Sequence, residues 1–556
     1  MSRSAAAVVA AVAAAVVLLL APPVHARDTL RIGVSQFPST LHPSIDSMLA
    51  KTYVHGMTLR PFTAFDHDWE VTCMLCTALP TFENGRATRV ERADGTTGVE
   101  VRYAIHPDAR WGDGVPVTTA DVLFAWRFGK HPESGVTSRE AYTDIVDIEV
   151  HGEKSFTLEL QDLEYRYNAI NTFQPLPAHL EEEVFAAAPA TYRNRTLYDT
   201  EPTNPGLALG PYRLAEVATG DYLVLERNPQ WWGAAPHFDR IVVEVVENTA
   251  ALEANLLAGE IDMIAGELGL PLDQALAFED AHGEDYRIVY QPGLIYEHLE
   301  ANLDNPILAD LRVRRALLHA VDREALSAQL FEGEQPVADT AVHPLDWVHI
   351  DDVAGYPRDL DEARTLLEEA GWRPGPDGVR VNDEGERLSF AFSTTAGNRS
   401  RALVQQFLQT QWAEVGVEAR IRNLPPRVLF AEELSRRQFS GMALFAWISA
   451  PESVPKTTLH STMIPSADNG WSGQNYTGYA NPEMDRLIEA IEVELDRDKR
   501  AELWAELQRL YAAELPALPL YFRANAHIWP TWLEGVRPTG HQDVSTLWVE
   551  DWRAAD

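Results

Sequence analysis

One short spacing in this chain could support covalent catalysis. Ser453-Val454-Pro455-Lys456 has the S-x-x-K pattern that supplies a serine nucleophile in one class of hydrolases. The pattern needs the serine at a helix start with the lysine one turn later, and Pro455 permits this only in the first turn. The partner motifs S-x-N and K-T-G are not found at fitting positions, because Thr458 follows Lys456-Thr457. G-x-S-x-G and H-E-x-x-H are also missing from the sequence, which therefore favours a protein that is not an enzyme.

The two cysteines, Cys73 and Cys76, stand in a C-x-x-C arrangement. In an oxidising compartment such a pair can form a disulfide, although a loop this short contributes only about 2 kcal/mol through chain entropy. Two reduced thiols are the alternative. Haem attachment would need histidine at position 77, where threonine stands. The 17 histidines form no H-x-H or H-x-x-x-H pair, and His343 and His349 have no evident third ligand, so we expect no cofactor and no metal.

Two segments carry side chains that could hold a polar solute. Residues 466–479 are too rich in glycine, asparagine and serine for a helix, and this predicted loop presents Trp471, Asn475 and Tyr476. A loop whose aromatic side chains only pack inward is the alternative. In residues 296–302, alternation places Tyr296 on one strand face and Glu297 on the other, and we expect one of the two to face a cleft.

The elements that must position these side chains follow from periodicity and capping residues. The sequence predicts helices at Asp310–Ala320, Asp322–Leu330, Asp361–Ala370, Pro482–Glu494 and Asp496–Ala513. Strand-like segments, Ile241–Val246 and Leu388–Phe392, fall between helices, and a short apolar run covers Leu518–Phe522. Alternation of strands and helices indicates an α/β architecture.

Residues 101–127 combine three local signals. Residues 101–105 alternate apolar and polar side chains as a half-buried strand does. Gly112–Gly114 supplies a tight turn, and Thr118 with Asp121 has the spacing of a capping box at a helix start. We expect this helix to bury Val122, Leu123 and Trp126.

The same stretch closely resembles the signature of the extracytoplasmic solute-binding proteins of family 5, which deliver peptides, nickel or opines to ABC importers. Trp111–Val122 reads W-G-D-G-V-P-V-T-T-A-D-V, similar to the family's W/F-x-D-G-x-P-V-T-A-x-D-V. Further segments resemble other sequence motifs of the family, in the same order along the chain: Thr29–Pro43, Gly210–Leu214, Leu225–Trp232, Leu257–Asp262 and Asp310–Glu324. The chain is identified as a member of this family and resembles its oligopeptide- and dipeptide-binding proteins.

Membership implies a two-lobed periplasmic-binding-protein fold of type II, in the large three-domain class. Mixed β-sheets flanked by helices would form each lobe, and the chain would cross a hinge more than once. The resemblance implies lobe I at residues 27–62, 203–293 and 521–556. It implies an accessory domain at residues 63–202 and lobe II at residues 294–520.

The resemblance also points to specific ligand contacts. In peptide-binding relatives the strand corresponding to residues 441–452 ends W-x-x-D, and the aspartate pairs with the ligand's ammonium. Here Trp447 is present, but Ala450 takes the place of the aspartate. An enclosed ammonium without an opposite charge costs several kcal/mol, so either the ligand lacks one or another carboxylate, Glu452 or Glu297, replaces the aspartate. The predicted ligand-binding residues are Trp447, Glu452, Tyr296, Glu297, Trp471, Asn475, Tyr476 and Phe37.

Residues 1–26 predict a secretory signal, with a basic Arg3, an apolar run from Ala5 to Leu20 and a small-x-small site at Val24–Ala26. The alternative is a membrane anchor, but no basic stop-transfer cluster follows the run. Since no cysteine lies at the cleavage site, we expect a periplasmic protein without a lipid anchor.

A net charge of −37 disfavours nucleic acid and anionic lipid as partners. We expect a monomer that binds a peptide or peptide-like solute and passes it to ABC permease subunits in the inner membrane. Because Ala450 stands where the peptide-binding relatives have an aspartate, opines, sugar-linked compounds and nickel chelates remain open as ligands. The sequence identifies neither the ligand nor the permease.

Overall fold

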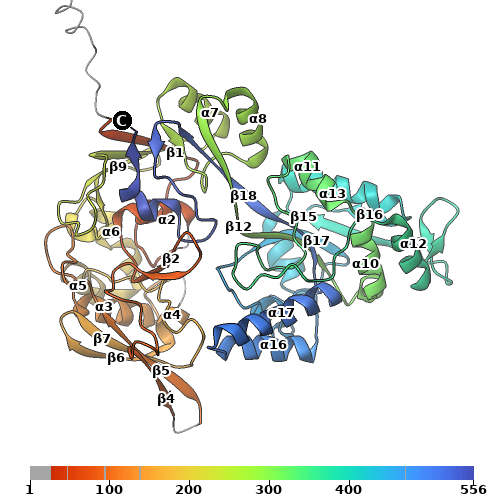
Figure 1. Cartoon of the computed structure of the whole chain (residues 1–556), viewed down its shortest axis with the longest axis horizontal. Helices are drawn as coiled ribbons and strands as arrows, with labels where there is room; N and C mark the ends of the chain where they lie inside the picture. Colours follow the sequence, from red (N-terminus) through yellow and green to blue (C-terminus); the bar gives the residue numbers. More distant parts are fainter. Residues whose placement is uncertain (1–26, 47, 93–94, 137–138, 470, 556) are drawn as a thin grey trace, which may run out of the picture.

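The computed structural model describes residues 27–46, 48–92, 95–136, 139–469 and 471–555 (Figure 1). A ten-stranded mixed sheet runs through it in the order β16-β15-β17-β12-β18-β11-β1-β10-β9-β8. In chain order, these strands are β1 (Thr29–Val34), β8 (Tyr212–Ala218), β9 (Tyr222–Arg227), β10 (Arg240–Val245), β11 (Met263–Ile264), β12 (Tyr286–Ala301), β15 (Ser389–Thr394), β16 (Glu418–Ile421), β17 (Met442–Ile448) and β18 (Leu518–Pro530).

Two long strands, β12 and β18, link the two halves of this sheet. They pair antiparallel from Tyr286↔Pro530 at one end to Leu299↔Leu518 at the other. β18 also pairs with β11 on the side of β1, whereas β12 pairs with β17. Figure 1 shows both strands passing between two bodies of the molecule. The pairing shifts register between Pro292 and Tyr296, an irregularity of the kind that bends a sheet.

The first body, on the left of Figure 1, combines one half of the large sheet with a separate four-stranded sheet of order β4-β5-β7-β6. That smaller sheet consists of β4 (Ala87–Glu91), β5 (Thr97–Ala104), β6 (Ile145–Gly152) and β7 (Ser155–Leu160). The helices of this body are α2 (Leu49–Thr58), α3 (Thr119–Lys130), α4 (Glu140–Thr143), α5 (Ala178–Ala187), α6 (Leu197–Thr200), α7 (Thr249–Ala258) and α8 (Leu272–His282). Short pairs β2 (Thr63–Phe65) with β3 (Val71–Cys73) and β19 (Leu533–Glu534) with β20 (Arg553–Ala554) complete it.

The capping box predicted for residues 118–121 is present at the start of α3. The Thr118 hydroxyl accepts a hydrogen bond from the helix N-terminus, and the Asp121 carboxylate accepts one from the Thr118 N–H at 2.8 Å. The expected buried face needs a correction, because Leu123 and Trp126 are only partly buried. The core-facing stripe of α3 is Asp121, Val122, Phe124, Ala125 and Phe128. Its Trp126 indole instead donates to the carbonyls of Tyr142 and Ile145 at the edge of the core.

The second body, on the right of Figure 1, holds the other half of the large sheet and most of the helices after residue 300. These are α9 (Pro306–Ala309), α10 (Leu311–His319), α11 (Arg323–Phe331), α12 (Leu360–Glu369), α13 (Arg399–Ala413), α14 (Pro426–Val428), α15 (Lys456–Leu459), α16 (Pro482–Val493) and α17 (Arg497–Glu514), with the small pair β13 (Arg373–Pro374) and β14 (Arg380–Val381). The five predicted helices are confirmed as α10, α11, α12, α16 and α17. Asp310, Asp322 and Asp496 cap their helices, whereas α12 begins earlier than predicted, at Leu360 after Asp359.

The predicted strands at residues 241–246 and 388–392 are confirmed as β10 and β15, each displaced by one or two residues. Short helical turns connect the larger elements, at η1 (Pro189–Asn194), η2 (Pro205–Leu207), η3 (Leu429–Leu434), η4 (Ser461–Met463) and η5 (Ser545–Asp551). A disulfide joins Cys73 and Cys76 at the end of β3. The predicted signal at residues 1–26 lies outside the described residues. Within the part of the chain that the structure describes, no helix has the length and apolar character needed to cross a membrane.

Candidate ligand-binding site

A cavity of about 140 Å³ lies in the second body, beside the point where β12 and β17 pair. Tyr296, His298 and Glu300 of β12 line it together because alternate residues of a strand share one face. Trp447 of β17 and Tyr511 of α17 complete the aromatic wall. Hydroxyl and amide groups from the short helix α15 and the loops around it form the rest of the polar lining: Ser449, Ser453, Thr457, Thr458, Gln474 and Thr477.

Glu300 is the carboxylate of this cavity, and only 3% of its surface is exposed. Its Oε1 atom accepts a hydrogen bond from the indole Nε1 of Trp447 at 3.3 Å and lies 3.3 Å from Nε2 of His298. Among the described residues, no hydrogen-bond partner reaches Oε2. Both nitrogens of His298 face acceptors, because Nδ1 lies 3.2 Å from the carbonyl oxygen of Tyr296.

The tyrosines around Glu300 are neutral hydrogen-bonding groups. The hydroxyl oxygens of Tyr296 and Tyr511 lie 3.0 Å apart and are buried. Burial raises the pKa of Tyr511 above its usual range, and the nearby Glu300 carboxylate adds to this shift. The Tyr296 ring stacks on the His298 ring at 5.0 Å between centroids. The cavity therefore offers aromatic faces and neutral hydroxyls around one carboxylate.

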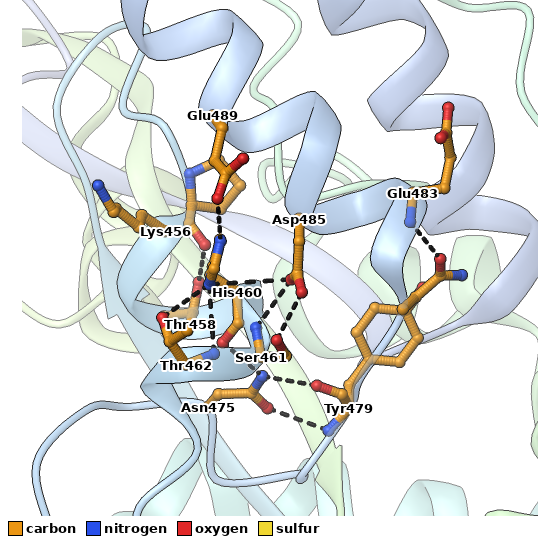
Figure 2. Close-up of polar contacts among 12 residues, drawn as sticks. Lys456, Thr458, His460, Ser461, Thr462, Asn475, Tyr479, Glu483, Asp485 and Glu489 are labelled. Atoms are coloured by element: carbon orange, nitrogen blue, oxygen red, sulfur yellow. Dashed lines mark hydrogen bonds and ion pairs between the residues drawn. The ribbon is translucent and has the colours of Figure 1, made fainter. Parts of the chain in front are cut away.

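The loops behind the cavity are fixed by a polar network (Figure 2). The side-chain amide of Asn475 donates to the carbonyl oxygens of Tyr479 at 2.8 Å and His460 at 3.2 Å, and its oxygen accepts from the N–H of Tyr479. The N–H of Ser461 donates to Asp485 of α16 at 2.8 Å. Asn475 is fully buried, so its side chain positions the loop and does not line the cavity.

The structure brings three predicted site residues together and separates the others. Trp447 and Tyr296 line the cavity, and the ring of Tyr476 lies behind Trp447 at 5.7 Å between centroids. Trp471 lies elsewhere on its loop, beneath the guanidinium of Arg436 at 5.5 Å. Phe37 is half-buried against the core of the first body.

Glu297 does not line the cavity, since it occupies the opposite face of β12 from Tyr296. Its carboxylate is fully buried and accepts hydrogen bonds from Nε and Nη2 of Arg401 at 3.1 and 3.0 Å. Arg523 of β18 donates to the same carboxylate. Both oxygens of Glu297 are therefore engaged by guanidinium groups.

Glu452 is also held by protein groups, at a contact between the two bodies. It accepts a hydrogen bond from the Trp347 indole, and its Oε2 lies 3.6 Å from Nε of Arg500. Burial raises the pKa of Glu452, while the Trp347 hydrogen bond and the charges of Arg166 and Arg500 oppose this shift. Arg166 belongs to the first body, next to Tyr165, so Glu452 takes part in an inter-body cluster.

The S-x-x-K pattern does not place a free lysine beside the serine. Ser453 lines the cavity, but Lys456 pairs through Nζ with Glu492 Oε2 at 2.8 Å, and this hydrogen bond raises the pKa of Lys456. A lysine stabilised in its charged form is a poor general base. No group of three or more His, Cys, Asp or Glu side chains that could hold a metal is found among the described residues.

His298, Glu300 and Tyr511 are among the cavity residues that the sequence does not predict as ligand contacts. The alternation that placed Tyr296 on one face of its strand also places His298 and Glu300 there, so the signal for two of them was present. Tyr511 has no such signal, because its apolar helical spacing predicts core packing.

Residues 82–467 match the family model described as bacterial extracellular solute-binding proteins, family 5. The chain belongs to this family. Oligopeptide-binding protein AppA of Bacillus subtilis (strain 168) is 25% identical over 480 residues, covering 84% of this chain and 82% of that protein. The family 5 fold and its mixed α/β architecture, with a large sheet and flanking helices, are thereby confirmed.

Solved structures of family 5 relatives superpose on almost the whole chain. The oligopeptide-binding protein of Thermus thermophilus, complexed with a pentapeptide, is 30% identical with a TM-score of 0.70, covering 95% of this chain and 96% of that one. NikZ of Campylobacter jejuni, in complex with Ni(L-His), has a TM-score of 0.71 at 22% identity, over 95% of this chain and 99% of NikZ. NikZ therefore shows a shared fold. Family 5 is a family of solute-binding proteins and not of enzymes.

Proposed function

We propose that this family 5 protein is the periplasmic substrate-binding component of an ABC importer. It encloses a peptide or peptide-like solute between two lobes and delivers it to permease subunits in the inner membrane. The relatives named as oligopeptide-binding proteins support the peptide class, because they align over most of both chains. The protein acts as a monomer, and the signal at residues 1–26 directs it to the periplasm.

The two-body arrangement is the observation that carries this proposal. β12 and β18 connect the bodies, and their register shift at Pro292–Tyr296 provides a place for bending. Rotation of one rigid body against the other is a common way to enclose a ligand. We assign lobe I to residues 27–62, 203–293 and 521–556, the accessory domain to residues 63–202 and lobe II to residues 294–520.

The cavity beside β12 is one wall of the solute site in this proposal. Trp447 and Tyr296 supply rigid contact area, which aromatic side chains offer at low entropic cost. Hydroxyl and amide groups such as Thr458 and Gln474 can pair with the amide groups of a peptide. A volume of about 140 Å³ is below the roughly 300–1,000 Å³ of a site that encloses a drug-sized ligand. The cavity thus receives one part of the solute.

Native mass spectrometry of protein purified gently from the periplasm tests the proposed function. We expect a bound species that denaturation releases and fragmentation identifies as a peptide. Protein unfolded, dialysed and refolded serves as the ligand-free control, and should bind synthetic pentapeptides with one-to-one stoichiometry in calorimetry. A released metal chelate or sugar-linked compound, together with no pentapeptide binding, would contradict the peptide assignment.

A further inference from the structure

The cavity in lobe II holds a buried glutamate, Glu300, and His298 is the only described lining residue beside it that can carry a positive charge. Its described lining residues include no lysine and no arginine, and Glu300 is their only carboxylate. In contrast, the two nearby buried glutamates lie beside guanidinium groups, Glu297 beside Arg401 and Arg523, and Glu452 beside Arg500. Glu300 is therefore the carboxylate in this region that the protein leaves without a guanidinium partner.

The contacts that Glu300 makes leave one oxygen unused. Trp447 and His298 both approach Oε1, while no group of the described residues hydrogen-bonds Oε2. A buried polar atom without a partner costs free energy, and a buried charge without an opposite charge costs more. Such a group is rarely retained in a native protein without a further role.

The surroundings of Glu300 suit a positive group. The aromatic rings of Tyr296, Trp447 and Tyr511 line the same cavity, and the faces of such rings attract cations. Their polar atoms are neutral, because burial raises the pKa of Tyr296 and of Tyr511 above the usual range. A cation entering the cavity would therefore meet one carboxylate, aromatic faces and hydroxyl acceptors.

We infer that this cavity receives a cationic group of the solute, an ammonium or a guanidinium, and that Glu300 is its counter-ion. The inference takes the cavity as part of the solute site and so rests on the proposed function. It narrows the proposed ligands to solutes that carry a positive charge on the part that enters lobe II. The charge can belong to a peptide's N-terminus or to a lysine or arginine side chain.

Three synthetic pentapeptides distinguish these sources. The first has a free N-terminus and uncharged side chains, the second is its N-acetylated form, and the third is N-acetylated with one lysine. We expect refolded protein to bind the second peptide roughly 10- to 100-fold more weakly than the first in calorimetry, as for loss of a charged hydrogen bond. Recovered affinity for the third peptide would identify a side-chain cation as an accepted source, and no recovery would identify the N-terminus.

Glu300→Gln tests the counter-ion, with Glu384→Gln as its matched control. Glu384 is an exposed carboxylate of the same lobe, so its substitution makes the same change in charge away from the cavity. In Glu300→Gln the first two peptides should bind within about twofold of each other, whereas Glu384→Gln should keep the wild-type difference. Glu300→Asp retains the charge and should retain part of the discrimination, which separates loss of charge from loss of packing.

A second probe pair separates this inference from the peptide proposal. If wild-type protein binds no pentapeptide but butylammonium raises its melting temperature more than butanol does, the peptide assignment fails and the cationic subsite stands. If charged and uncharged probes of both kinds behave alike in wild-type protein, the subsite is overturned. Equal discrimination by wild type and Glu300→Gln would also overturn it.

Discussion

Arg500 of α17 lies over the ring of Tyr165, with 3.9 Å between its guanidinium carbon and the ring centroid. The two residues belong to different bodies of the molecule, Arg500 to the second and Tyr165 to the first. Tyr165 also donates its backbone N–H to the carbonyl oxygen of Glu492 at 3.0 Å, and Glu70 pairs with Arg497 at 2.5 Å. These contacts hold the two bodies together at a distance from the hinge strands.

Tyr165→Ala should favour separation of the two bodies. The substitution removes a cation–π contact of about 0.5–2 kcal/mol without touching the cavity beside β12. We expect a larger radius of gyration in small-angle scattering of the ligand-free protein and faster dissociation of bound solute. Tyr165→Phe keeps the ring and serves as the control. Equal scattering from the alanine variant and wild type would show that this contact does not maintain the arrangement.

Arg500→Met should lower stability more than an exposed ion-pair substitution does. It leaves Glu452 buried next to Asp346 without its nearest guanidinium, and removing one partner of a buried pair costs about 3–5 kcal/mol. The exposed ion pair of Glu70 with Arg497 gives a comparison, because Glu70→Gln should lower the free energy of unfolding by about 1 kcal/mol or less. Thermal unfolding of both variants measures the difference. A similar melting temperature for the two would contradict the structural role assigned to Glu452.

Asp543 should make the stability of the first body depend on pH. Burial raises the pKa of its carboxyl to about 7, although hydrogen bonds from the Phe65 N–H and from Asn171 oppose the shift. Because the folded state holds this proton more tightly than the unfolded state, the contribution of Asp543 to stability falls as pH rises from about 4 to 7. Asp543→Asn should therefore raise the melting temperature relative to wild type more at pH 8 than at pH 5. An equal difference at both pH values would contradict the shift.

Asn475→Ala should loosen the loop behind the cavity. The substitution leaves buried backbone groups of His460 and Tyr479 without the side-chain hydrogen bonds of Figure 2, at a cost of about 1–3 kcal/mol each. Faster amide hydrogen exchange at residues 460–479 and weaker solute binding should follow together. Asn469→Ala, in the exposed part of the same loop, is the control. Weaker binding without faster exchange would instead indicate that Asn475 contacts the solute directly.

The sequence predicts helices well where a capping residue and an apolar stripe coincide, as at Asp496 and α17. It underestimates β18, which continues from the apolar run at Leu518–Phe522 to Pro530, because Arg523, Asn525 and His527 interrupt the apolar pattern. Those polar side chains become paired or buried only when the whole sheet has assembled. Arg523, for example, reaches Glu297 across the sheet.

The candidate site was predicted only in part, for a related reason. Alternation in β12 separates Tyr296 from Glu297, but it does not reveal which face meets a cavity and which meets Arg401, 104 residues away. Glu452 is similar, since its partners Trp347 and Arg500 are distant in the chain. Local patterns therefore predict the strands and loops of the site. Which carboxylates can bind a ligand depends instead on ion pairs between residues far apart in the sequence.

The position of β18 in the large sheet bears on how this chain folds. β18 lies between β12 and β11, yet it is made from residues 518–530, far along the chain from both. Until those residues are synthesised, β12 and β11 present unpaired strand edges, and such edges are prone to aggregation. The native sheet thus cannot form before β18 has been synthesised, so it depends on long-range insertion of a strand that follows β12 and β11 in the chain. A chain that ends before Leu518 would lack the strand that both halves of the sheet share.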